Sequence, residues 1–96
     1  MKKYEIMFIV RPDLDEASAK QVAENMKNTI VNFGSNVTEV KEMGQRELAY
    51  EIKKYKNGYY FLFNVEANNA DAIKEFDRLA LISEDIIRHI VIKVED

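Results

Sequence analysis

The spacing of the apolar residues switches between two periods along this chain, and the order of the switches is the strongest constraint on its fold. A period of two residues is typical of strands, and a period of three to four is typical of helices. Here the order is strand, helix, strand, strand, helix, strand. Two βαβ halves with right-handed crossovers predict an α+β, ferredoxin-like βαββαβ sandwich, in which a four-stranded antiparallel sheet carries both helices on one face. At 96 residues, we expect a single domain over residues 1–96.

The first half of the pattern predicts a strand over residues 3–10 and then a helix. Pro12 ends the strand, and Asp13 is the predicted N-cap because Glu16 follows it at capping-box spacing. The helix is predicted to run to about residue 33, where a glycine follows. Its predicted buried stripe consists of Val22, Met26, Ile30 and Phe33.

The centre of the chain is predicted to form a hairpin. Residues 36–43 are rich in β-branched residues and predict the second strand, and alternation resumes after Gly44. The pair Asn57-Gly58 is a strong signal for a two-residue turn, so the third strand is predicted at about residues 59–66.

The last part of the pattern predicts the second helix and the fourth strand. Asn68 or Asn69 is the predicted cap of a helix at about residues 70–82, and residues 86–94 form the last strand. The predicted buried stripe of this helix consists of Ile73, Phe76, Leu79 and Ala80.

Composition and charge exclude several classes of protein. The chain has no cysteine, which excludes a disulfide framework, a thiolate metal site and a cysteine nucleophile. The apolar run of residues 6–10 is too short for a signal peptide or a membrane span, so we expect a soluble cytoplasmic protein. The net charge of −3 disfavours non-specific binding to nucleic acid. Residues 41–60 nevertheless hold five basic and three acidic residues, which allows a local basic face.

No constellation for catalysis is found. His89 is the only histidine, and we interpret it as a strand residue rather than as a zinc ligand or a base. The loop "RPDLDE" lacks the glycines of a phosphate-binding loop, and no serine lies in a nucleophile motif. Asp13, Asp15 and Glu16 suit helix capping better than a hard cation. We therefore predict no enzyme, no metal, no cofactor and no small-molecule substrate.

The sheet face opposite the helices is predicted to be open and apolar. If the even-numbered residues of the first strand face the helices, the odd-numbered ones face outward. Tyr59 and Tyr60 then point to opposite faces, so they cannot both be stacking platforms. Such a patch marks a protein partner, or it is partly covered by loops. Its predicted members are Met7, Ile9, Tyr60, Leu62, Ile90 and Ile92.

The segment "GQRELAYEIK", residues 44–53, resembles the signature of the S6 family of bacterial small-subunit (30S) ribosomal proteins. The opening "KKYEIMFIVRPDLDE", the strand "GYYFLFNVEAN" and the ending "IIRHIVIKV" also resemble the pattern of this family at the same spacing. The resemblance implies a ferredoxin-like structural constituent of the small ribosomal subunit. It further implies binding to small-subunit ribosomal RNA in the platform, together with ribosomal protein S18 as a heterodimer.

The basic residues are the candidates for RNA contact, because phosphates attract lysine and arginine. Tyr50 is left open between hairpin packing and an exposed role. The acidic remainder of the chain could face a more basic protein partner. The alternative function is a free regulatory or protein-docking module of the same fold with no RNA role. The candidate RNA-binding residues are Arg46, Arg88, Lys2, Lys3, Lys53, Lys54 and Lys56.

Overall fold

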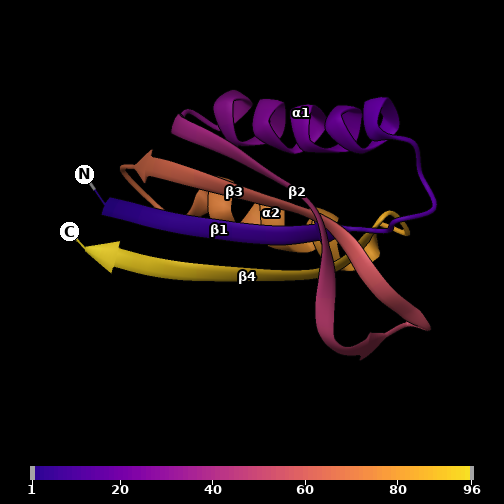
Figure 1. Cartoon of the computed structure of the whole chain (residues 1–96). Coiled ribbons are helices and arrows are strands. Elements are labelled where there is room, and N and C mark those ends of the chain that lie inside the picture. Colours follow the sequence, from indigo (N-terminus) through magenta and orange to yellow (C-terminus); the bar gives the residue numbers. More distant parts are fainter. Residues whose placement is uncertain (1, 96) are drawn as a thin grey trace.

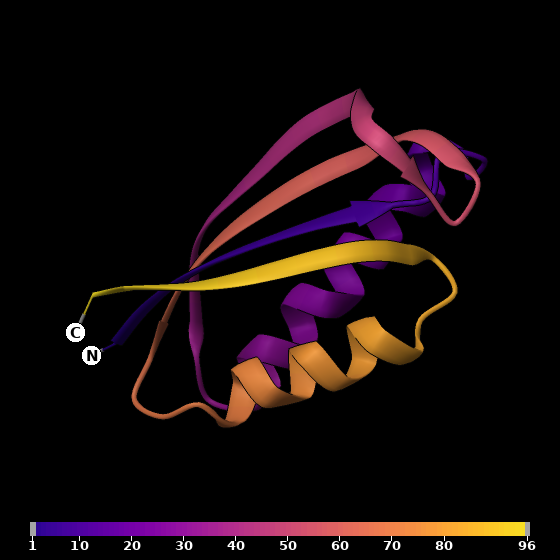
Figure 2. The same cartoon turned by 90° about the horizontal axis from the view of Figure 1, so that it is seen from below.

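Four antiparallel strands form one sheet in the order β2-β3-β1-β4, and two helices cover one face of it (Figures 1 and 2). The computed structural model describes residues 2–95. Its elements are β1 (Lys2–Val10), α1 (Glu16–Asn32), β2 (Asn36–Ile52), β3 (Tyr55–Ala67), α2 (Asp71–Ile82) and β4 (Ile86–Glu95). The predicted ferredoxin-like βαββαβ arrangement is therefore confirmed.

The core lies between the sheet and the helices, and its centre is a cluster of aromatic rings. Phe8 of β1 stacks on Phe61 of β3 at 5.3 Å between ring centroids and meets Phe63 edge-on at 5.2 Å. Phe76 of α2 closes the cluster at 5.7 Å from Phe8. All four rings are buried, and each such burial stabilises the fold by about 1.5–3 kcal/mol. The predicted inward direction of the even residues of β1 is correct.

The N-cap of α1 is Asp15, so the prediction of Asp13 is wrong. The Oδ1 atom of Asp15 accepts a hydrogen bond from the backbone N–H of Ser18 at 2.7 Å. Hydrogen bonds from Ser18 also hold the pKa of the Asp15 carboxyl below its ordinary value. Asp13 instead lies in the turn that follows Pro12, where its carboxylate pairs with Arg11 at 3.2 Å. Both aspartates thus have structural roles.

The face of α1 that packs on the sheet is built from smaller residues than predicted. The buried positions are Ala19, Ala23, Met26 and Ile30, which keep the helical period. Val22 is only partly buried, and Phe33 is 48% exposed just beyond the helix end. The two alanines let the helix backbone approach the sheet closely, and a search for large apolar residues overlooks them.

The second helix begins differently from the first. Its N-cap is Ala70, which makes no side-chain cap bond. The prediction of Asn68 or Asn69 as the cap is therefore wrong, although Asn69, one residue before the N-cap, accepts a hydrogen bond from the N–H of Asp71 at 3.0 Å. Ile73, Phe76 and Ala80 are buried as predicted, and Leu79 packs partly buried against the core.

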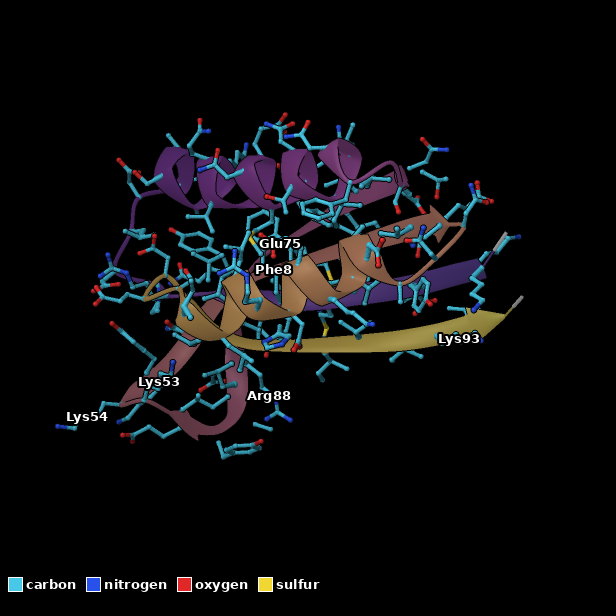
Figure 3. All side chains as sticks on the ribbon, turned by 180° about the vertical axis from the view of Figure 1, so that it is seen from behind. Phe8, Lys53, Lys54, Glu75, Arg88 and Lys93 are labelled. Carbon is cyan, nitrogen blue, oxygen red and sulfur yellow. The ribbon has the colours of Figure 1, made fainter. Side chains whose placement is uncertain are left out.

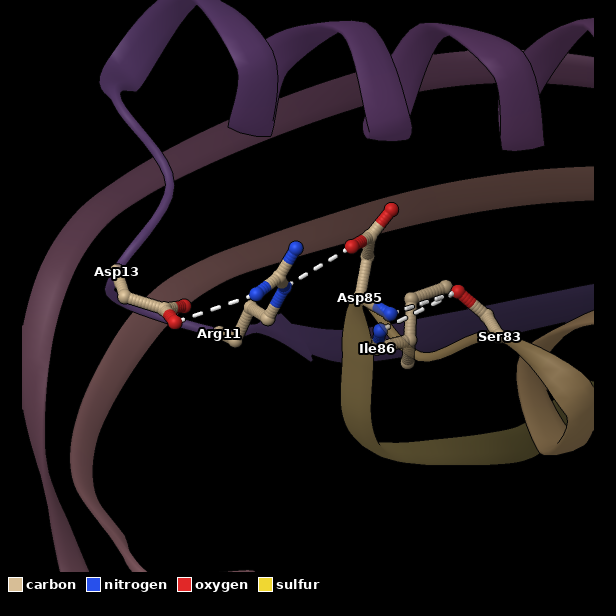
Figure 4. Close-up of polar contacts among 5 residues, drawn as sticks. All are labelled: Arg11, Asp13, Ser83, Asp85 and Ile86. Carbon is tan, nitrogen blue, oxygen red and sulfur yellow. Dashed lines mark hydrogen bonds and ion pairs between the residues drawn. The ribbon is translucent and has the colours of Figure 1, made fainter.

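A polar latch joins the loop after β1 to the loop before β4 (Figure 4). The Nε atom of Arg11 donates to Oδ1 of Asp85 at 3.0 Å, and the backbone N–H of Arg11 donates to the Asp85 carbonyl at 2.8 Å. The hydrogen bond to Asp85 raises the pKa of the Arg11 guanidinium. Ser83 accepts from the N–H of Asp85 at 3.1 Å, which fixes the start of β4.

Candidate nucleic-acid interface

The turn of the central hairpin lies at Lys53 and Lys54, so the prediction of a turn at Asn57-Gly58 is wrong. Ile52 pairs with Tyr55, and the two lysines between them have φ angles of 50° and 70°. Positive φ at both central residues is the geometry of a type I′ turn, which normally uses Asn-Gly. A left-handed non-glycine residue costs about 1–2 kcal/mol. Two such lysines side by side are a strained feature of the kind found at functional sites.

Gly58 lies inside β3 because the strand there passes very close to β1. A Cβ at Gly58 would collide with Cγ2 of Ile9 and lie 2.9 Å from the carbonyl oxygen of Val10. Glycine is therefore needed for a close backbone approach rather than for a turn. The sequence therefore indicated correctly that glycine is needed at position 58, but the cause is a close strand contact and not a turn.

A bulge at Gly44 bends β2. Glu42 pairs with Phe61 and Gly44 with Tyr60, so the residue between them has no partner on β3. Gly44 has φ +78°, which only glycine adopts readily. The Nε atom of Arg46 donates to the carbonyl of Met43 at 3.2 Å and supports the bulge. The irregular alternation around residues 43–47 was the sequence signal for this feature.

Beyond the bulge, the end of β2 curves over the open face of the sheet. Between the pairs Glu47–Asn57 and Ile52–Tyr55, residues 48–51 lie opposite Lys56 alone. We call residues 48–52 the hairpin arch. The arch and the sheet enclose a hollow lined by Met7, Ile9, Leu48, Tyr60 and Ile90, among others. The long hairpin leaves the body of the sheet in Figure 1.

The hairpin arch buries one residue of the predicted partner face. Ile9 was expected to be exposed, but it is only 4% exposed because the arch covers it. Met7, Tyr60, Leu62 and Ile90 are half-buried. Ile92 is 52% exposed at the other end of the face. The alternative that loops partly cover this face therefore holds for the hairpin end and not for the far end.

Tyr50 and Arg88 meet across the hollow. The guanidinium of Arg88, on β4, lies 5.6 Å from the centre of the Tyr50 ring, and its Nη1 donates to the Tyr50 hydroxyl. Tyr50 is 59% exposed, so it is not a core residue. A ring held by a guanidinium and open to solvent is able to stack on a nucleobase. The sequence alone did not predict this contact, because it forms only when the arch brings Tyr50 over β4.

The predicted RNA-binding residues fall into two groups. Arg46, Lys53, Lys54 and Lys56 are exposed on the hairpin, and Arg88 lies beside it. Lys2 and Lys3 lie at the N-terminal end of β1, at the opposite end of the sheet (Figure 1). Figure 3 shows the separation, with Lys53, Lys54 and Arg88 at one end and Lys93 at the other. The molecule is 37 Å long, so the two groups would meet different parts of a bound RNA.

The far end of the open face is apolar and carries charges of both signs. We call the surface formed by Glu5, Leu62, Asn64, Glu66 and Ile92 the distal sheet face. Glu5 pairs with Asn64 on one side and Ile92 on the other, and Glu66 lies further along β3. The Nδ2 atom of Asn64 donates to Oε1 of Glu39 at 2.7 Å. The open face thus changes from basic and aromatic at the hairpin to aliphatic with charges of both signs at the other end, where Lys3 pairs with Glu66 and Lys41 with Leu62.

Side chains that resemble catalytic or metal-binding groups have structural partners. His89 lies 2.6 Å from Asp77 of α2 and packs edge-on against Phe76. Over residues 2–95, no group of three or more histidine or acidic residues is arranged to hold a metal ion. Neither α1 nor α2 has the length and apolar character that crossing a bilayer requires.

The family model described as Ribosomal protein S6 matches residues 3–93. The chain belongs to the ribosomal protein S6 family. The crystal structure of 30S ribosomal protein S6 from Thermotoga maritima is similar, with a TM-score of 0.91 and 28% sequence identity over 97% of this chain and 87% of that chain. The resemblance in the signature and the three flanking segments is thereby confirmed. As an S6-family member, this is a structural protein of the small ribosomal subunit and not an enzyme.

Proposed function

We propose that this S6-family protein binds small-subunit ribosomal RNA in the platform and pairs there with ribosomal protein S18. In this role it is a single domain over residues 1–96, bound to the ribosome in the cytoplasm. The observation that carries the proposal is the division of the open sheet face into a basic, aromatic hairpin end and an aliphatic distal sheet face with charges of both signs at its rim. Phosphates and bases favour the first surface and an apolar protein surface favours the second, so one face can serve both.

The hairpin end is the proposed RNA contact. Tyr50 offers a ring on which a base can stack, while Arg46, Arg88, Lys53, Lys54 and Lys56 offer positive charge to phosphates. The strained turn holds two lysine side chains at the tip, where they meet solvent (Figure 3). Lys2 and Lys3 are proposed as a separate phosphate contact at the far end of β1.

The distal sheet face is the proposed contact with S18. Ile92 is more than half exposed, and Met7, Leu62 and Ile90 continue the apolar surface toward the centre of the sheet. Glu5 and Glu66 at its rim can accept hydrogen bonds from basic side chains of the partner, and Lys3, which pairs with Glu66, can meet an acidic one. An apolar centre with a charged rim is the usual composition of a protein interface.

RNA binding is tested by titrating small-subunit ribosomal RNA with the protein at several salt concentrations. Arg88→Ala and Tyr50→Ala should each weaken binding by about 1–3 kcal/mol, the usual value of a stacking or bidentate contact. The double substitution Lys2→Ala with Lys3→Ala should instead lower the salt slope with little change in base preference. Equal affinity for the wild type and the Arg88 and Tyr50 variants would exclude the hairpin end as the RNA contact.

The S18 contact is tested with a charged substitution at its centre. Ile92→Lys should weaken binding to purified S18, while Val31→Lys, on the solvent side of α1 and 48% exposed, should not. RNA affinity should also be measured with and without S18, since tight and equal binding in both cases would contradict joint binding. An Ile92→Lys variant that binds S18 like the wild type places the S18 contact elsewhere.

A further inference from the structure

The helical side of the molecule carries a groove between α1 and α2, on the face opposite the proposed RNA and S18 contacts. We call it the interhelical groove. It has a volume of 370 Å³, and its apolar floor is formed by Val22 and Met26 of α1 and by Leu79 and Ile82 of α2. Asn25 and Thr29 form the α1 side of the rim, and Ser83 and Asp85 close one end. Figure 2 shows both helices on the same side of the sheet.

The apolar floor reaches the surface at Ile82. This side chain is 66% exposed although it lines the groove, and Val22 and Leu79 are only partly buried. The α1 rim next to it is uncharged, because it consists of Asn25 and Thr29, and Asn25 accepts a hydrogen bond from Gln21 at 2.9 Å. An apolar floor of this kind fits a row of apolar side chains from an amphipathic helix.

The charges around the groove determine which amphipathic segment fits. Asp85 lines the groove, and the exposed Glu84 precedes it in the chain. Arg11 pairs with both Asp13 and Asp85, so a single cation is shared by two carboxylates. Arg78 pairs with Glu75 of the same helix at 2.7 Å. Lys20 of α1 is engaged by Glu16 and Glu42 on the other side of that helix. The Ser83 end of the groove is therefore acidic.

We propose that the interhelical groove docks a basic amphipathic segment of a partner protein. Its apolar side chains would cover Ile82 and Leu79, and its lysines or arginines would meet Asp85 and Glu84. Nucleic acid does not fit, because its phosphates would face these carboxylates. A second copy of this chain in a two-fold contact would present the same groove and its carboxylates rather than a row of basic side chains.

The proposal is tested by chemical-shift mapping on the intact, isotope-labelled protein. The probe is a synthetic leucine–lysine amphipathic peptide of about four helical turns, and the comparison peptide has glutamate in place of lysine. The lysine peptide should shift the amide signals of the residues that line the groove, and the glutamate peptide should not. Signals that move only on the sheet face, equal binding of both peptides, or no binding would overturn the proposal.

Ile82, which lines the groove, and its neighbour Leu81, which does not, form a test variant and its matched control. Ile82→Ser should reduce the affinity for the lysine peptide by about tenfold or more, as expected for a central interface residue. Leu81→Ser should leave it unchanged, because Leu81 is 69% exposed and does not line the groove. Glu84→Lys should also weaken binding. Both serine variants should keep the wild-type spectrum away from the substitution, and equal effects of Ile82→Ser and Leu81→Ser would contradict docking in the groove.

Discussion

Ile9 and Ile92 lie on the same face of one sheet, yet their surroundings are opposite. Ile9 is 4% exposed and Ile92 is 52% exposed. Both occupy outward positions on neighbouring strands, where Glu5 pairs with Ile92 and Ile9 pairs with Arg88. The difference comes from the hairpin arch, which covers the first and does not reach the second.

This contrast shows that the face on which a side chain lies and the burial of that side chain are separate properties, although an alternating pattern is often taken to predict both. Alternation sets the face on which a side chain lies, because successive side chains in a strand point to opposite sides. It does not determine what covers that face. Here the cover is made by the chain's own β2, bent by a bulge at Gly44 and by the unpaired stretch of residues 48–51.

The contrast predicts a large difference in stability between two matched substitutions. Ile9→Ala should lower the free energy of unfolding by about 2–4 kcal/mol, because it removes buried methyl groups and leaves a cavity under the arch. Ile92→Ala should change it by no more than about 0.5 kcal/mol, as for other surface positions. Urea unfolding of the two variants measures both values, and equal losses would mean that the arch does not cover Ile9 in solution.

Gly58 of β3 packs against Ile9 in the same region. Gly58→Ala should destabilise the protein by about 1–3 kcal/mol, the usual cost of overpacking, since the new methyl group meets Ile9 and the backbone of Val10. The measurement is again urea unfolding. If Gly58→Ala is combined with Ile9→Ala, part of the loss should be recovered, because the collision with the isoleucine is removed. Full additivity of the two losses would contradict this contact.

The elements and their order followed from the sequence, whereas the shape of the hairpin did not. The periods of β1, α1, α2 and β4 are set by burial on one side, which alternation records directly. The turn depends on a local choice between Asn57-Gly58 and Lys53-Lys54, and short-range statistics favour the first. The close approach of β3 to β1 decides the choice, and it is a tertiary contact that no local pattern contains.

The candidate site shows the same limit. The basic residues of the hairpin were found from their charge alone. The contact between Tyr50 and Arg88 joins residues far apart in the chain and depends on the arch, so neither position alone indicated it. The residues of the predicted partner face do point outward, but Ile9 is covered by the arch, and their role as a partner face stays a prediction.

Gly44 and Gly34 allow the bend itself to be tested. Both have positive φ and no heavy atom near the position of a Cβ, so alanine at either should cost about 1–2 kcal/mol from backbone strain alone. Only Gly44→Ala changes the bulge that places the hairpin arch. It should therefore weaken RNA binding and shift the ring signals of Tyr50, while Gly34→Ala, at the end of α1, should change stability only. Equal RNA affinity in the two variants would show that the bulge does not position the arch.

The smallest expected effect on stability lies at the hairpin tip. There the same substitutions should raise the free energy of unfolding and weaken RNA binding. Lys53→Asn with Lys54→Gly supplies the residues that a type I′ turn favours, so the free energy of unfolding should rise by about 1 kcal/mol. The same change removes two positive charges, so the salt slope of RNA binding should fall by about 2 and the affinity with it. Lys53→Gln with Lys54→Gln removes the charges but keeps side chains that are strained at positive φ, so it should weaken RNA binding without the gain in stability. If the Asn-Gly variant is more stable and binds RNA as tightly as the wild type, the two lysines are not phosphate contacts, and the strain at the tip has another cause.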